Sequence, residues 1–170
     1  MYKRQVSAAQ ELGSNCVIVV PCTDSTMADN AAKISGVSKV IAAKSDVFSN
    51  YDAAAWAEAL DSVMPDGVIV TAASAQSKDL AARLAARRGI PVIQDVIAID
   101  GGILSTPIYS GKAIQNVSVS GNSVVSIRAN IFPSADNSGS SDVQVIDTTG
   151  NVTTALKEMV QRASQRLDVS

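Results

Sequence analysis

The 170-residue sequence contains no histidine, and this absence excludes several kinds of catalytic site. A Ser-His-Asp triad, a Cys-His pair and a His-ligated zinc ion all need an imidazole, as does the usual general base near neutral pH. Only two cysteines are present, Cys16 and Cys22. They bracket one extended apolar run, which places them too far apart for a disulfide. We therefore expect two buried or half-buried thiols.

Phosphate-binding motifs and an excess of one charge are also lacking. Neither GxGxxG nor GxxxxGK[ST] occurs, which excludes a dinucleotide fingerprint and a P-loop. The net charge is −2 at pH 7, so there is no basic field to attract nucleic acid. No apolar run approaches the roughly 18 residues of a membrane helix, and the first residues lack the apolar core of a signal peptide. We expect a cytoplasmic protein without membrane insertion.

What is present is enough apolar material for one folded domain, with 46% hydrophobic and 18% charged residues. Short, unbroken, β-branched runs alternate with segments of helical periodicity. Continuous apolarity is typical of parallel strands that are covered on both faces. The first half is predicted to contain strands at 16–20, 37–43, 67–72 and 91–94, and helices at 6–12, 25–34, 52–63 and 77–88.

The second half changes character. Residues 104–110, 113–120 and 123–132 are predicted strands separated by glycine-containing turns, a short strand follows at 143–146, and residues 153–167 show a clear helical stripe. Together the patterns predict a Rossmann-like α/β fold. It has a mainly parallel sheet with helices on both faces and an antiparallel hairpin extension around residues 104–132.

Ligands of such sheets bind beyond the carboxyl ends of the strands, beside helix N-termini. Three loops are candidates here: 21–25, 73–78 and 94–95. The middle loop is the most suggestive, because its polar side chains could meet a phosphate at the start of a helix. The alternative is that Ser77 caps the helix and Lys78 is solvated. The candidate anion or nucleotide loop consists of Ser74, Gln76, Ser77 and Lys78.

Other charged residues favour structural or docking roles. Asp95 follows a strand, and it is either a turn residue or a general base without a partner. Arg128 is a lone charge in an apolar strand, so it needs a carboxylate or carbonyl partner and could anchor a subunit interface. Arg83, Arg87 and Arg88 form a solvated face or a docking face. We expect no catalytic residue and no metal site.

Five segments of the sequence have a characteristic order and spacing. They are AAKISGVSKV (31–40), KDLAARLA (78–85), IPVIQDV (90–96), PIYSGKA (107–113) and SIRANIF (126–132). Their order resembles the N-terminal domain of the electron transfer flavoprotein alpha subunit. The likeness extends over about residues 6–170, and PIYSGKA with the strands after it favours the alpha over the related beta subunit.

The resemblance implies an electron carrier for fatty acid beta-oxidation in the bacterial cytoplasm. It implies a heterodimer with the beta subunit that accepts electrons from acyl-CoA and related dehydrogenases and passes them to a quinone oxidoreductase or another acceptor. FAD would be bound by a C-terminal domain that is absent here, so this fragment should hold no flavin and have no enzyme activity of its own. Its role would be that of a scaffold that docks the beta subunit.

Both ends of the sequence are expected to be truncated. An α/β unit normally begins with a strand, whereas the first predicted element here is a helix, and residues 1–5 fit no pattern. We therefore expect one N-terminal α/β domain at 6–170, preceded by five foreign or disordered residues.

Two other functions are compatible with the same residues. A stand-alone adenine-nucleotide-binding module, similar to the adenine-nucleotide alpha hydrolases in fold, would use the loops at 21–25 and 73–78. A simple dimerisation domain would use no ligand.

Overall fold

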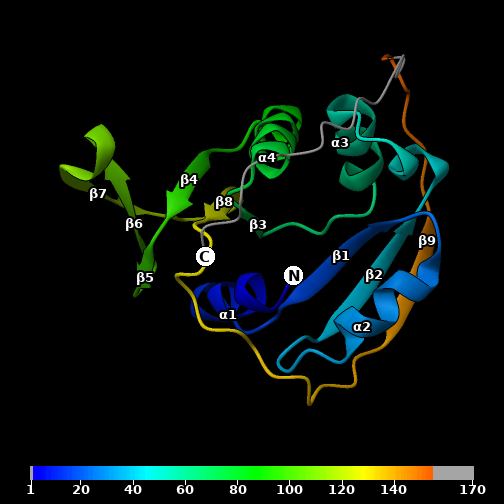
Figure 1. The fold of residues 1–170 in the computed structure, drawn as a ribbon, viewed down its shortest axis with the longest axis horizontal. Coiled ribbons are helices and arrows are strands. Elements are labelled where there is room, and N and C mark those ends of the chain that lie inside the picture. The colour runs from blue at the N-terminus through cyan, green and yellow to red at the C-terminus, as the bar shows by residue number, and fades with distance from the viewer. Residues whose placement is uncertain (1, 155–170) are drawn as a thin grey trace, which may run out of the picture.

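A computed structural model describes residues 2–154 of the chain (Figure 1). Its first layer is a parallel sheet of three strands in the order β1-β2-β9. The strands are β1 (Val17–Cys22), β2 (Lys39–Lys44) and β9 (Val143–Asp147). The inner strand β2 is almost entirely buried, as its run of apolar residues predicts.

A second parallel sheet has the order β3-β8-β4. It consists of β3 (Val68–Ala72), β8 (Ser123–Ile127) and β4 (Val92–Val96). Every residue of β8 is buried, because this strand lies in the middle of the sheet between helices. The predicted parallel α/β architecture is confirmed, but the parallel strands of the described residues form two separate sheets.

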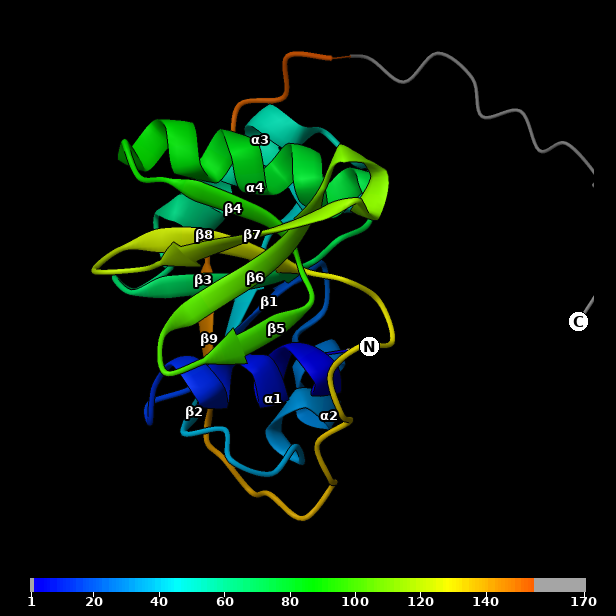
Figure 2. The same cartoon turned by 90° about the vertical axis from the view of Figure 1, so that its left-hand side faces the viewer.

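The third sheet is antiparallel and projects from the body as an arm (Figures 1 and 2). It consists of β5 (Ala98–Asp100), β6 (Ile103–Ile108) and β7 (Ala113–Ser118). The predicted hairpin extension is therefore confirmed at 104–118 and wrong at its carboxyl end. Residues 123–127 pair with β3 and β4 in parallel, because their side chains are apolar or small on both faces and fit an interior position.

Helices cover both faces of the sheets, as predicted. On one face lie α1 (Lys3–Leu12) and α2 (Asp29–Ala32), and on the other lie α3 (Ala53–Asp61) and α4 (Ala75–Arg88). Helix α2 is a single turn after a 3₁₀ turn at Ser25–Ala28, so the longer helix predicted at 25–34 is wrong in type and length. The helix predicted at 153–167 lies outside the described residues from position 155 onward.

The first helix begins earlier than its apolar spacing indicated. It starts at Lys3 and not at Val6, so Lys3, Arg4 and Gln5 are helical and not disordered, and the alternative expectation that residues 1–5 are foreign stays a prediction. The guanidinium of Arg4 donates a hydrogen bond to the carbonyl of Phe132, which ties this first turn to the loop after β8.

Candidate functional site

The candidate loop 73–78 begins helix α4, and Ser74 is its N-cap residue. The Ser74 hydroxyl oxygen accepts a hydrogen bond from the Ser77 backbone N–H at 3.2 Å and donates one to the Ser77 hydroxyl at 2.8 Å. Ser77 therefore lies inside the first turn and does not itself cap the helix. Gln76 is exposed, and its carbonyl accepts a hydrogen bond from the Tyr51 hydroxyl at 2.9 Å.

An ion pair lies at the same edge of the sheet, with Asp95 in the last part of β4, and not after a strand as predicted, and with Arg128 directly after β8. The Arg128 guanidinium donates to both carboxylate oxygens of Asp95, at 2.6 and 3.3 Å. Arg128 thus has the carboxylate partner that its apolar strand context required. The hydrogen bond from Arg128 lowers the pKa of Asp95, and the charge of Lys78 lowers it further against the opposing effect of burial.

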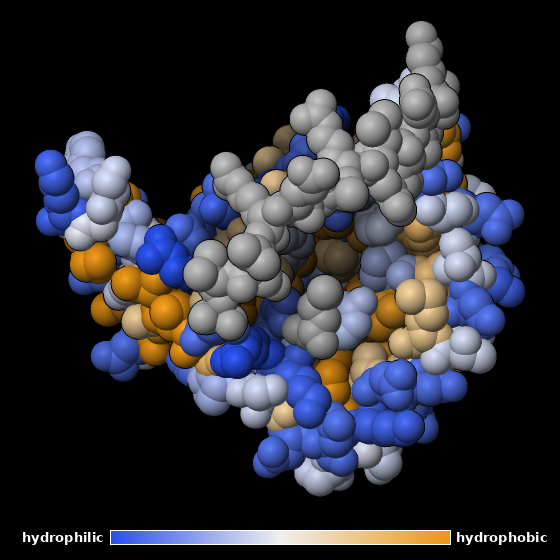
Figure 3. Space-filling view, in the orientation of Figure 1, coloured by the Kyte–Doolittle hydropathy of each residue, from blue (hydrophilic) through white to orange (hydrophobic). Residues whose placement is uncertain are grey.

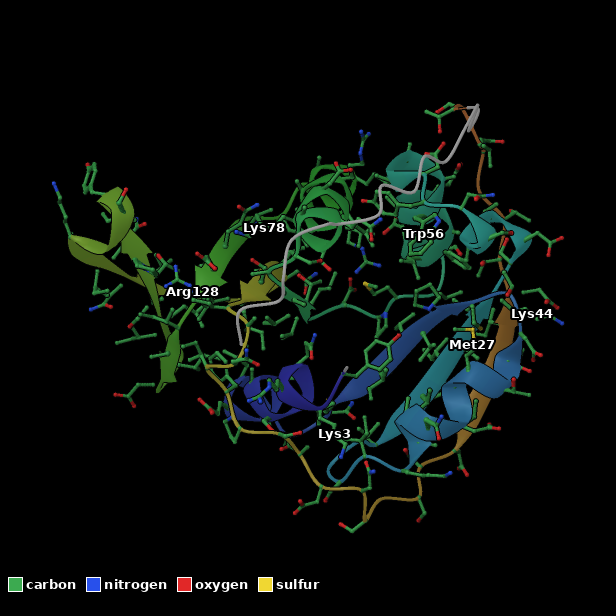
Figure 4. All side chains as sticks on the ribbon, viewed as in Figure 1. Lys3, Met27, Lys44, Trp56, Lys78 and Arg128 are labelled. Carbon is green, nitrogen blue, oxygen red and sulfur yellow. The ribbon has the colours of Figure 1, made fainter. Side chains whose placement is uncertain are left out.

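The backbone around Asp95 departs from regular β structure. Asp95 has a φ of 63°, and the pairing of β4 with β8 shifts register between Ile93 and Val96. The Asp95 N–H donates to the Ser126 hydroxyl at 3.0 Å, which holds the irregular turn. This bulge turns the Asp95 carboxylate toward Arg128 and Lys78, and Figure 4 shows Lys78 and Arg128 at the same edge of the structure.

The Asp95–Arg128 ion pair and Lys78 form one cluster of charged side chains. This cluster brings together two of the three predicted loops, 73–78 and 94–95. Lys78 and the start of α4 lie near Asp95, which is already paired with Arg128. The remaining loop, 21–25, follows β1 in the other parallel sheet, where Asp24 caps a 3₁₀ turn by accepting the Thr26 N–H. The cluster offers a cation and a helix N-terminus, but its carboxylate is held in the charged form and is a poor general base.

The three neighbouring arginines of α4 have different roles. Arg83 forms an exposed i,i+4 pair with Asp79 at 3.2 Å, and Arg87 lies 3.5 Å from Asp61. Arg88 is the most buried of the three, and its guanidinium donates to the Asp61 carboxylate and to backbone carbonyls at the end of α3. Arg88 therefore fastens α4 to α3, so the predicted uniform solvated face is wrong at this position.

Both cysteines are buried and free, as expected from their positions. Burial raises the pKa of the Cys16 thiol. Burial also raises the pKa of Cys22, and the nearby charge of Asp24 adds to the effect. Few thiolates form under these conditions, so neither side chain is a ready nucleophile. Across residues 2–154, no group of His, Cys, Asp or Glu side chains is arranged to hold a metal ion, and no helix is long and apolar enough to cross a membrane.

A groove of about 530 Å³ between β4 and the arm does not fit the pyrophosphate of a flavin dinucleotide. Ile93 and Gln94 form one wall of this groove, and Thr106 and Val117 form the other. Its lining contains no charged side chain. A pyrophosphate binds where cations or helix N-termini face it, and this groove provides neither.

Two features escaped the sequence interpretation. Asp52 caps α3 and also binds Thr154 at 2.6 Å, a contact between positions 102 residues apart that no local pattern reveals. The arm exposes large apolar side chains: Ile103 is 46%, Tyr109 78% and Ile114 52% exposed. The alternation in 113–120 was a visible signal that one face of this strand is not part of the core.

Comparison with known proteins completes the description of the site. The profile of the electron transfer flavoprotein domain family matches residues 4–168. The chain therefore belongs to the electron transfer flavoprotein family.

Three relatives within this family are alpha subunits. The chain is 32% identical to electron transfer flavoprotein subunit alpha of Paracoccus denitrificans over 143 residues, 82% of this chain and 46% of the relative. It is 31% identical to the subunit alpha of Bacillus subtilis over 148 residues, 79% of this chain and 45% of the relative. The subunit alpha of Mycobacterium tuberculosis (strain ATCC 25618 / H37Rv) is 32% identical over 132 residues, 73% of this chain and 41% of the relative. The chain thus spans less than half the length of these relatives and corresponds to the N-terminal domain of the alpha subunit.

Proposed function

We propose that residues 6–170 form a single N-terminal scaffold domain of an alpha-type electron transfer flavoprotein, and that this domain docks a beta subunit. The observation that carries the proposal is the family match over residues 4–168 together with alpha subunits at about 32% identity. The architecture supports it, because two helix-covered parallel sheets provide a rigid frame. A rigid frame is what a domain without chemistry of its own contributes to an electron carrier.

In the whole protein, FAD would supply the redox chemistry. It would be held by the part of the alpha subunit that lies outside this chain. The complete carrier would take electrons from acyl-CoA and related dehydrogenases in the bacterial cytoplasm and deliver them to a quinone oxidoreductase or another acceptor. The contribution of this chain is to position its partner, and we assign it no catalytic residue.

We further propose that the arm is the surface that docks the beta subunit. Monomeric proteins seldom present several large apolar side chains on one projecting sheet. Figure 3 shows apolar residues gathered where the arm joins the body, over β5 and β6. Ile103, Tyr109 and Ile114 extend this apolar character onto the exposed part of the arm.

A pull-down with a beta subunit tests the proposal. The chain and an electron transfer flavoprotein beta subunit are co-expressed with a tag on one partner, and flavin absorbance is recorded on the purified chain alone. We expect retention of the partner and no stoichiometric flavin in the isolated chain. Stoichiometric yellow flavin in the chain without its partner would contradict the scaffold role.

The alternative function is binding of an adenine nucleotide at Ser74, Gln76, Ser77 and Lys78. The observation that favours it is the meeting of Lys78, Arg128 and the start of α4 at one edge of a parallel sheet. Calorimetry with AMP and ATP distinguishes the two functions. Micromolar binding that is lost in Lys78→Ala supports the nucleotide module, and the absence of heat leaves the scaffold as the function.

A further inference from the structure

Strand β7 is an outer strand of the projecting arm, and its free edge lacks the usual protection against pairing (Figure 1). Among residues 2–154 it pairs with β6 alone, and its sequence, AIQNVS, contains no charge and no proline. Its pairing with β6 runs from Ala113 to Ser118 without a bulge. Natural proteins protect exposed edges by charges, prolines, bulges or short strands, and the other outer strand of the arm, β5, has 3 residues and contains Asp100. The edge of β7 is therefore open to a further strand.

The register of β7 shows which of its backbone groups point to this free edge. The Val119 N–H donates a hydrogen bond to the Gly102 carbonyl at 3.3 Å, so Val119 faces the β6 side. Because backbone direction alternates along a strand, the N–H and C=O groups of Gln115 and Val117 also face β6. The residues whose N–H and C=O groups point to the free edge are Ile114, Asn116 and Ser118.

Two features of β6 agree with this assignment. The Ser105 carbonyl accepts a hydrogen bond from the N–H of Ile97, which directly precedes β5. Ser105, which lies opposite Asn116, therefore faces β5 and not β7. Pro107, which lies opposite Ile114, has no N–H to donate, so it is tolerated only where no bond to β7 is needed.

The residues at this edge are accessible, although the strand itself is anchored. Ile114 is 52% exposed, and Asn116 and Ser118 are also exposed. Val117, in contrast, is half-buried and packs against the core cluster that contains Leu104. The body of the protein therefore holds β7 in position while its outward backbone groups remain free to pair.

The charge beside this edge indicates which kind of partner fits. Lys112 directly precedes β7, is exposed and forms no ion pair with a carboxylate of residues 2–154. Residues 113–120 contain no carboxylate, so a second copy that paired β7 with β7 would bring no opposite charge from its own strand. A different chain with an acidic residue at this position is complementary. Ile114 also belongs to the exposed arm surface to which we assign the beta subunit.

We propose that β7 binds an extended segment of the beta subunit by strand addition, through about five residues that pair with positions 114–118. The segment is uncharged at its centre and has an acidic residue beside Lys112. The inference rests on the proposed function and adds the mode of recognition to the docking surface. Backbone hydrogen bonds supply affinity in this mode, and the complementary charge at one end fixes the register of the added strand.

A proline at position 116 tests the backbone pairing. Asn116→Pro removes an N–H that points to the free edge, and an edge strand tolerates this change because no bond to β6 depends on it. Asn116→Ala is the matched control, since both variants lose the hydrogen bond that the Ser105 hydroxyl donates to the Asn116 side chain at 2.8 Å. In calorimetric titration with the beta subunit, we expect Asn116→Pro to weaken binding about tenfold and Asn116→Ala to leave it within about twofold of the parent chain.

Amide hydrogen exchange in the unchanged chain provides a second measurement, which does not depend on how the proline variant folds. Addition of the beta subunit should slow exchange about tenfold at the outward N–H groups of Ile114, Asn116 and Ser118. Gln115 and Val117, which already face β6, are the internal control. Unchanged exchange at the three outward amides in a formed complex would overturn strand addition.

The acidic residue of the partner is tested at Lys112. Lys112→Glu places like charges together and should weaken binding about tenfold, whereas Lys112→Gln should weaken it less. Equal affinity of Lys112→Glu and the parent chain would overturn the acidic end of the proposed segment.

Failure of this inference is distinguishable from failure of the proposed function. If the complex forms and Asn116→Pro and Asn116→Ala bind with equal affinity, strand addition is wrong and the arm still docks the beta subunit through its side chains. If the parent chain does not bind the beta subunit at all, the docking role and strand addition are both wrong.

Discussion

At the scale of single residues, Asp52 joins two distant parts of the chain. One carboxylate oxygen accepts the N–H groups of Ala54 and Ala55, at 3.0 and 3.1 Å, and so caps α3. The other accepts the Thr154 hydroxyl at 2.6 Å and its N–H at 3.2 Å. These hydrogen bonds, led by the one from the Thr154 hydroxyl, lower the pKa of Asp52 to about 2.

This shift predicts acid sensitivity in a defined pH window. The pKa of Asp52 falls from 3.8 to about 2 on folding, so its contribution to stability is present above pH 4 and is lost as the pH falls toward 2. Asp52→Asn should lower Tm by several degrees at pH 7, and the difference from the parent chain should shrink as the pH falls from 4 to 2. Thermal unfolding followed by circular dichroism across pH 2–7 measures this, and a difference that does not change with pH would contradict it.

Two glycines are required by close backbone approach. A Cβ at Gly150 would lie 2.3 Å from the carbonyl oxygen of Ala55, and one at Gly139 would lie 2.3 Å from that of Ile34. Gly150→Ala or Gly139→Ala should each lower the free energy of unfolding by about 1–3 kcal/mol, as overpacking does.

Gly13→Ala is the matched control for these two variants. Gly13 has an extended φ of −176°, and a Cβ there meets nothing within 4 Å. Urea titration should leave this variant as stable as the parent chain. Equal stability of all three variants would contradict the close contacts.

At the scale of elements, local patterns identified the strands better than their partners. The unbroken β-branched runs at 16–20 and 67–72 predicted β1 and β3, because a covered strand needs apolar residues on both faces. The same reasoning missed that β8 enters a parallel sheet between β3 and β4. That placement depends on pairing between residues more than fifty positions apart, such as Ile69 and Val124, which no local window contains.

The candidate site shows the same division. That Arg128 needs a carboxylate partner was predictable from its apolar strand. That the partner is Asp95 was not predictable, because a bulge and a positive φ at Asp95 turn its carboxylate toward Arg128. A serine cap of α4 was predictable from composition. The choice of Ser74 over Ser77 depends on where the helix begins, and periodicity places helix boundaries poorly.

The tip of the arm allows docking to be separated from stability. Tyr109 and Ser110 both have positive φ, at 51° and 57°, where a side chain is strained. Tyr109→Gly removes strain together with the exposed ring, so it should keep or raise the free energy of unfolding and weaken beta-subunit binding about tenfold, as the loss of an aromatic anchor does. Ser110→Gly is the matched control, since it relieves strain and leaves the ring in place. Calorimetric titration that gives equal affinity for both variants would exclude the arm as the docking surface.

At the scale of the whole molecule, the role that we propose for the chain is that of a frame that carries other components. Several charged side chains are held by partners within the fold: Asp95 pairs with Arg128, Asp61 pairs with Arg88, and Asp52 accepts hydrogen bonds from backbone and hydroxyl donors. Such contacts fix helices and loops relative to one another. The exposed arm, in contrast, offers apolar surface without a cover among residues 2–154.

Sedimentation velocity of the chain, alone and mixed with an electron transfer flavoprotein beta subunit, tests the central claim most directly. The account predicts a monomer alone and a one-to-one complex in the mixture, which Tyr109→Gly weakens and Ser110→Gly does not. Independent sedimentation of the two proteins at micromolar concentrations would contradict the assignment of this chain as the beta-docking scaffold of an alpha-type electron transfer flavoprotein.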